Sequence, residues 1–144
     1  MDEKIVNAVL DAMEKKAKQL GVTGVAVYMD ARVTNGNTMH PHVRVVERLE
    51  RPAQPEDRGP DDTGTNYFGV VMTKVGEMLS TMKDSGQADR PPRKGEFGWP
   101  GGLIFVDEGG SRYFAFSGGT GEEDVWIAEM GAAAVGLDPE FHVE

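Results

Sequence analysis

The sequence contains no cysteine, which excludes disulfide bonds, thiolate metal sites and a cysteine nucleophile. It also has no apolar run approaching the roughly 20 residues that a membrane-spanning helix needs. The first residues, MDEKIVNAVL, begin with acids and continue amphipathically, which is unlike a secretory signal. We therefore expect a globular, cytoplasmic protein.

Positive charge is scarce as well. The net charge is −9, from 24 acidic against 15 basic residues, and most of the bases are scattered among acids. A nucleic-acid-binding surface needs clustered lysines and arginines to displace counterions. The one tight basic group, residues 90–94, falls in a proline-containing loop. We therefore expect neither nucleic acid nor an anionic membrane as a partner.

The first half of the chain reads as a helix, two strands and a loop. Residues 2–20 place apolar side chains at helical spacing and stop at a glycine, which predicts a helix. Residues 22–31 and 42–50 are rich in β-branched residues and predict strands. In the second of these, arginines alternate with valines, which suits one solvent-exposed face. Residues 51–65 combine prolines, acids and glycines and predict a long loop, which in compact domains is usually functional or mobile.

The second half predicts a helix, a hairpin and a final helix. The helix begins near residue 67, with Asp62 or Thr65 as its cap, and the hairpin turns at Gly109-Gly110. The last helix covers residues 121–136. The resulting order, α-β-β-α-β-β-α, predicts one α+β domain over residues 1–144, with a mostly antiparallel sheet flanked by helices.

The segment SGGTGEED, residues 117–124, is the densest group of small and acidic residues in the chain. Its simplest interpretation is a turn that leads into a helix, with Thr120 and Glu123 forming a capping box. The alternatives are a phosphate-binding nest and a pocket wall for another ligand. The acids of the first turn argue against phosphate, and no lysine follows the glycines, so the Walker pattern is absent. The turn is the favoured interpretation.

Other candidate chemistry is sparse. His40 and His42 share one face of a predicted strand and form a potential metal clip, with Asp30 as a conceivable third ligand, although a polar loop explains them more simply. Lys74 lies within an apolar helical pattern, where lysines usually extend to solvent. Trp99 is either a stacking surface or a core aromatic, as is the second tryptophan, at position 126. No serine has the GxSxG context of a hydrolase nucleophile.

The order of these segments resembles the GlcG/HbpS family of haem-binding-like proteins, which includes the C-terminal domain of PduO-type proteins. The resemblance rests on the strand VTGVAVYMDA, the lysine of VMTKV, the double glycine of PGGLIF and the segment FSGGTGEEDVWIAEMGAAAV. The last of these is close to the family pattern G-V-S-G-G-T-x-x-x-D-x-x-I-A-x-x-G. The likeness covers most of the chain apart from about residues 32–65.

The resemblance implies a homo-oligomeric accessory protein that binds a small molecule or cofactor between the sheet and the helices. The candidate ligand-binding residues are Lys74, Gly101, Gly102, Ser117, Gly118, Gly119 and Thr120. Some family members bind haem, usually with a histidine on the first helix, and that helix has none here. An axial ligand would then have to be His40, His42 or a methionine.

Two other classes of function stay open. One is an enzyme acting on a small acid or a diol-derived metabolite, with Lys74 as acid, base or carboxylate anchor. No catalytic pair or metal set is visible in the sequence, so an enzyme is the less favoured reading. The other is a purely structural or interaction module, which predicts a solid interior with no cavity beside Lys74 and the glycine turns.

Overall fold

The computed structural model describes residues 3–32 and 38–141. Its main sheet has four antiparallel strands in the order β2-β1-β6-β5. A separate two-stranded ribbon pairs β3 with β4. The elements are α1 (Glu3–Leu20), β1 (Gly24–Asp30), β2 (His42–Val46), β3 (Glu50–Arg51), α2 (Pro55–Arg58), β4 (Thr65–Asn66), α3 (Tyr67–Thr81), β5 (Gly102–Asp107), β6 (Gly110–Ser117), α4 (Gly121–Ala133) and the short 3₁₀ helix η1 (Pro139–Phe141).

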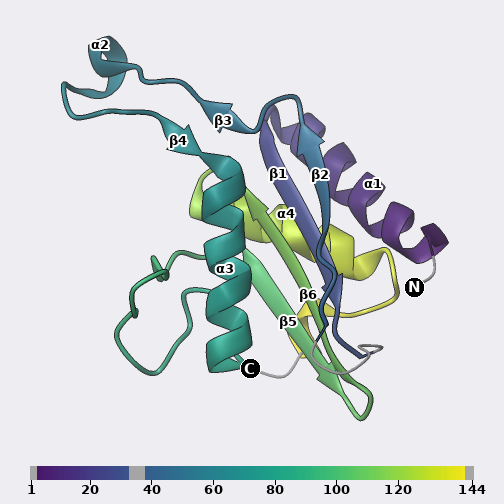
Figure 1. Cartoon of the computed structure of the whole chain (residues 1–144). Helices are drawn as coiled ribbons and strands as arrows, with labels where there is room; N and C mark the ends of the chain where they lie inside the picture. The colour runs from purple at the N-terminus through teal and green to yellow at the C-terminus, as the bar shows by residue number, and fades with distance from the viewer. Residues whose placement is uncertain (1–2, 33–37, 142–144) are drawn as a thin grey trace.

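Helices cover both faces of the main sheet, with α3 on one face and α1 and α4 on the other (Figure 1). The side chains under α1 and α4 form one core cluster, and those under α3 form a second. Successive residues of a strand point to opposite faces, so β1 supplies both clusters and is buried at every position. The predicted α+β class, the antiparallel sheet and the order of the main elements are confirmed.

The helices begin and end close to where local signals place them. The helix predicted over residues 2–20 is observed as α1, and its apolar stripe faces the sheet. The capping box predicted at the start of α4 is present: Thr120 Oγ1 accepts the Glu123 N–H (3.2 Å), and Glu123 Oε1 accepts the Thr120 N–H (2.9 Å). Within residues 3–32 and 38–141, none of the helices combines the length and apolar character needed to cross a bilayer.

The strand predicted over residues 42–50 is shorter than expected. Its pairing with β1 stops at Val46, because Glu47 adopts a φ of 69°, in the left-handed region that bends the chain away. Three residues further on, Glu50 and Arg51 pair with β4 and not with the main sheet. A single exposed residue therefore divides one predicted strand between two sheets.

The solvent-exposed face of β2 carries the valines and not the arginine. Val43 and Val45 are 39% and 40% exposed, whereas Arg44 is half-buried. The Arg44 guanidinium donates to the carboxylates of Asp11 (2.8 Å) and Glu14 (2.7 Å) on α1. These acids hold the arginine on the face that α1 covers, so the valines lie at the open edge of the other face.

Residues 48–66 form an arm that extends from the body beside α3 (Figure 1). The segment predicted as a loop contains the helix α2, and the β3–β4 ribbon closes its base. The Arg51 guanidinium donates to both carboxylate oxygens of Asp62, each at 2.9 Å, and so connects the two sides of the arm.

This ion pair changes how α3 begins. The Asp62 carboxylate also accepts the backbone N–H of Gln54 (2.7 Å), so it is engaged within the arm. The cap of α3 is instead Asn66, whose Oδ1 accepts the Gly69 N–H at 2.9 Å. The predicted caps, Asp62 and Thr65, are therefore wrong by one to four residues.

Candidate functional site

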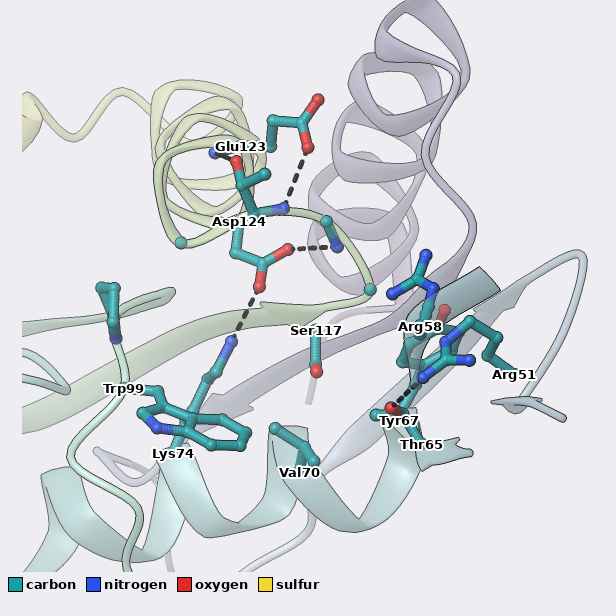
Figure 2. A pocket seen from close by; sticks show the side chains of 15 residues that line it. Arg51, Arg58, Thr65, Tyr67, Val70, Lys74, Trp99, Ser117, Glu123 and Asp124 are labelled. Atoms are coloured by element: carbon teal, nitrogen blue, oxygen red, sulfur yellow. Dashed lines mark hydrogen bonds and ion pairs between the residues drawn. The ribbon is translucent and has the colours of Figure 1, made fainter. Parts of the chain in front are cut away.

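A cavity of about 570 Å³ lies where α3, the β6–α4 turn, the arm and the loop before β5 meet. Figure 2 shows its lining side chains. The arm contributes Arg51, Arg58 and Thr65, and the loop before β5 contributes Trp99 and Pro100. The remaining lining residues come from α3 and from residues 117–124. The volume falls within the range typical of small-molecule sites.

A buried ion pair forms one wall of the cavity. Lys74 Nζ donates to Asp124 Oδ2 at 3.0 Å and to the carbonyl oxygen of Phe116 at 2.7 Å. The other carboxylate oxygen, Asp124 Oδ1, accepts the Gly119 N–H at 2.8 Å. The side chains of Lys74 and Asp124 are only 4% and 5% exposed. The pair therefore links α3, the end of β6 and the start of α4.

Burial shifts both members of the pair toward their neutral forms. It raises the pKa of Asp124 to about 6, although the Lys74 ammonium and the Gly119 N–H both act in the opposite direction. Burial also lowers the pKa of Lys74, against the attraction of the Asp124 carboxylate. Desolvation penalises each charge, and only the partner keeps the pair ionised. Perturbed titratable groups in a cavity are typical of functional sites.

The double glycine predicted as part of the site lies behind this pair and does not line the cavity. A Cβ at Gly101, whose φ is +120°, would stand 2.5 Å from Lys74 Nζ and 2.8 Å from Asp124 Cβ. A Cβ at Gly102 would stand 2.6 Å from the Met78 methyl carbon. Gly101 thus leaves room for the lysine and the carboxylate to meet, and Gly102 leaves room for the Met78 side chain.

Ser117, Gly118, Gly119 and Thr120 all line the cavity with Lys74. The amides of Gly119 and Thr120 are already bonded to the carboxylates of Asp124 and Glu123. A phosphate nest needs such amides free, so this geometry favours the turn and pocket-wall interpretations over phosphate binding. The turn also touches the start of β1: a Cβ at Gly118 would overlap the Thr23 carbonyl oxygen, and one at Gly24 would overlap that of Ser117.

The Ser117 side chain is the polar group of this wall that is open to the cavity. The residue is 4% exposed, and Figure 2 shows its hydroxyl directed into the cavity. Among the described residues its hydroxyl forms no hydrogen bond, so it can bond to a molecule in the cavity. Lys74 has a related feature, because two of its three N–H donors go to Asp124 and Phe116 and one is left.

Two arginines of the arm face this wall from the other side of the cavity. The Arg51 guanidinium is held by Asp62, whereas the Arg58 guanidinium is exposed and has no ion-pair or hydrogen-bond partner among the described residues. Sequence reasoning missed both arginines because the arm lies outside the segments that carry the family resemblance. It also treated Asp124 only as one of the acids that argue against phosphate, although the D of the family pattern marked that position.

The histidines lie elsewhere. His42 pairs with Tyr28 on β1, whereas Ser117 pairs with Val25, so the two are separated along β1 by about 10 Å. Asp30, the conceivable third ligand, is bound to Arg32 at 2.9 Å. Within the described part of the chain, no group of three or more His, Asp or Glu side chains is placed to hold a metal ion.

Comparisons with known proteins give one informative result. No family model matches the sequence, and no curated protein matches it. The crystal structure of a PduOC:haem complex superposes with a TM-score of 0.69, at 16% sequence identity. The superposition covers 96% of this chain and 97% of that one. At this identity the likeness shows that the chain has a PduOC-like fold.

Proposed function

We propose that the protein binds a small organic anion in the cavity beside Lys74 and Asp124 and acts as a binding or accessory protein. The observation that carries the proposal is the Ser117 hydroxyl, which forms no hydrogen bond to another described residue and is directed into the cavity. A ligand oxygen would accept its hydrogen bond in place of solvent. A hydrogen bond to a charged group contributes about 1.5–3 kcal/mol.

The charges around the cavity favour an anion. Lys74 and Asp124 neutralise each other, and so do Arg51 and Asp62. Glu123 keeps its negative charge but is held at the Thr120 N–H, beside the positive end of the α4 dipole. Arg58 is the lining cation that forms no ion pair among the described residues. An unpaired arginine suits a carboxylate.

Haem has weak support in this cavity. Its lining contains no histidine, methionine or cysteine, and Tyr67 is the one lining side chain of a kind that holds haem iron in some proteins. His40 and His42 lie away from the cavity, on and before β2. The haem of the PduOC complex is therefore not transferred to this cavity.

The Lys74–Asp124 pair supports an enzyme as the second candidate. A carboxyl group whose pKa is raised to about 6 is suited to proton transfer near neutral pH. In that case Asp124 would exchange a proton with a bound acid, and Lys74 would hold the developing charge. The third class, a structural module, predicted a solid interior at this position, and the cavity argues against it.

Calorimetric titration with a panel of two- to five-carbon hydroxy and oxo acids, and with inorganic phosphate, tests the proposal. At least one carboxylate is expected to bind, and Ser117→Ala should weaken it about tenfold or more, because a hydrogen bond to a charged group is lost. Arg58→Gln should weaken it about two- to fivefold. Arg48→Gln, which removes an exposed arginine that does not line the cavity, is the matched control.

If no acid binds, or if Ser117→Ala leaves the affinity unchanged, the proposed site is wrong. The enzyme candidate requires more than binding. Any acid that binds would also have to be converted, and Asp124→Asn would have to abolish turnover while binding is retained. Turnover that persists in Asp124→Asn would contradict that mechanism.

A further inference from the structure

Two exposed aromatic rings stack on each other, and one of them belongs to the lining of the cavity. Phe97 and Trp99 stack with ring centroids 4.5 Å apart and an interplanar angle of 21°. They are 51% and 49% exposed, and Trp99 lines the cavity. Large apolar side chains are usually left this exposed for a reason when they sit together beside a hollow.

A buried carboxylate holds this aromatic pair in place. Glu77, which is 2% exposed, lies one turn after Lys74 on α3. Its Oε1 accepts the N–H of Gly98, the residue between the two rings, at 3.1 Å, and its Oε2 accepts the Gly86 N–H at 2.7 Å. The same helix therefore places the lysine of the site and fixes the loop that carries Trp99.

The loop has further restraints of its own. The Arg90 guanidinium donates to both carboxylate oxygens of Glu96, at 2.8 and 3.0 Å. Gly98 has a φ of +70°, and a Cβ there would stand 3.0 Å from the ring of Pro92. Exposure of the two rings is thus fixed by the fold and is not the result of a loose loop.

The polar and aromatic groups occupy opposite sides of the cavity. Figure 2 shows Trp99 on one side, Arg51 and Arg58 on the other, and Ser117 between them. A flat ring on Trp99 would place a substituent on the same molecule toward the hydroxyl and the guanidinium. Aromatic rings attract one another in stacked or edge-to-face geometry beyond their area burial.

We propose that the ligand of this cavity is a planar aromatic anion, with its ring against Trp99 and its anionic group at Ser117 and Arg58. Trp99 determines specificity, and Glu77 is a positioning residue that acts through the Gly98 turn. This inference rests on the proposed function, since it names the class of anion that the same cavity prefers.

The experiment compares two monoanionic carboxylates, 2-naphthoate and cyclohexanecarboxylate, by calorimetric titration. The first is planar and aromatic, whereas the second is neither. In wild type, 2-naphthoate is expected to bind at least tenfold more tightly. Trp99→Leu should remove this preference by weakening 2-naphthoate about tenfold and leaving cyclohexanecarboxylate nearly unchanged, and Trp99→Phe should largely retain it. Trp126→Leu, which removes the other tryptophan, should change neither affinity.

Glu77 needs a readout that a general loss of stability would not change. In a Trp126→Phe background Trp99 is the only tryptophan, so its fluorescence reports the loop directly. Glu77→Gln should increase acrylamide quenching of Trp99 and reduce the preference for 2-naphthoate at temperatures where circular dichroism shows the variant folded. Unchanged quenching and preference would remove Glu77 from the proposal.

The outcomes separate this inference from the function on which it rests. Equal affinity for the two carboxylates, or an equal loss of affinity for both in Trp99→Leu, would overturn the aromatic preference. Neither result would contradict the proposed binding of an anion. Absence of binding by both carboxylates and by the whole panel of small acids would overturn the proposed function itself. A change of oligomeric state in Trp99→Leu with no change of affinity would assign the rings to a protein contact and overturn the inference.

Discussion

Two ion pairs of nearly equal length border the cavity, and their carboxyl groups behave in opposite ways. Lys74 and Asp124 are 3.0 Å apart between α3 and α4, whereas Arg51 and Asp62 are 2.9 Å apart in the arm. Burial raises the pKa of Asp124 to about 6, whereas the Arg51 guanidinium holds the pKa of Asp62 far below its usual range. The distance between partners therefore does not decide how a carboxyl group titrates.

The surroundings of each pair account for the difference. The inner pair lies between a sheet and two helices, where desolvation outweighs the attraction of one ammonium group. The arm is narrow, so less protein surrounds the outer pair (Figure 1). The Asp62 carboxylate also accepts hydrogen bonds from the backbone N–H groups of Gln54 and Gly64. The Arg51 guanidinium binds it in a bidentate manner. The inner pair is thus costly to ionise, and the outer pair is easy to ionise.

Breaking the inner pair should have the largest effect on folding. Lys74→Met leaves Asp124 without its cation in a buried position, which should reduce the free energy of unfolding at pH 7 by about 3–5 kcal/mol. Urea denaturation measures the loss. Lys18→Met removes an exposed i,i+4 pair with Glu14 and should cost less than about 1 kcal/mol. Similar losses in the two variants would show that burial does not distinguish their ion pairs.

The titration of Asp124 should have the next largest effect. Because its pKa in the folded protein is about 6, against 3.8 for the unfolded chain, the folded state holds this proton more tightly. The stability from this group is complete below about pH 4 and is lost as the pH rises through about 6, a change of about 2–3 kcal/mol. The difference in unfolding free energy between wild type and Asp124→Asn, followed from pH 4 to 7, should therefore fall with rising pH. A difference that increases with pH would contradict the raised pKa of Asp124.

Breaking the outer pair should have the smallest effect on global stability. Arg51→Gln removes the main cause of the low pKa of Asp62, so that pKa should move up toward 3.8 while the Gln54 and Gly64 N–H groups keep part of the shift. Carbon-13 NMR of the Asp62 carboxyl group measures this change. Amide hydrogen exchange at Gln54 should accelerate while urea denaturation at pH 7 changes little. A loss as large as that of Lys74→Met would make the arm part of the cooperative core.

Features encoded by neighbouring residues could be predicted from the sequence. The capping box of α4 needs only Thr120 and Glu123, and the stripe of α1 needs only helical periodicity. Features that depend on distant partners could not be predicted in this way. Arg44 faces α1 because of acids 30 and 33 residues away, and Asn66 caps α3 because Asp62 is bound by Arg51. The left-handed Glu47 that ends β2 has no local signal, since glutamate rarely adopts that conformation.

The candidate site also has a side that could be predicted from the sequence and a side that could not. Lys74 and residues 117–120, which a family pattern marks, do lie together on one side of a cavity. Gly101 leaves space for the ion pair and Gly102 leaves space for Met78, and neither glycine lines the cavity. The opposite side comes from segments without a recognisable pattern, namely the arm and the loop that carries Trp99. No local signal in the sequence indicates that these segments meet the first.

The contact between Gly24 and Gly118 limits how this cavity can change. Backbone meets backbone there, and any side chain at either position would overlap a carbonyl oxygen. Point mutation therefore has little scope to reshape the wall around Ser117, whereas exposed positions such as Arg58 and Trp99 accept many side chains. We expect proteins that share this fold to keep glycine at the positions of Gly24 and Gly118. Their ligands should differ through changes in the arm and in the loop that carries Trp99. Those two segments are also where a library for altered ligand preference should be built.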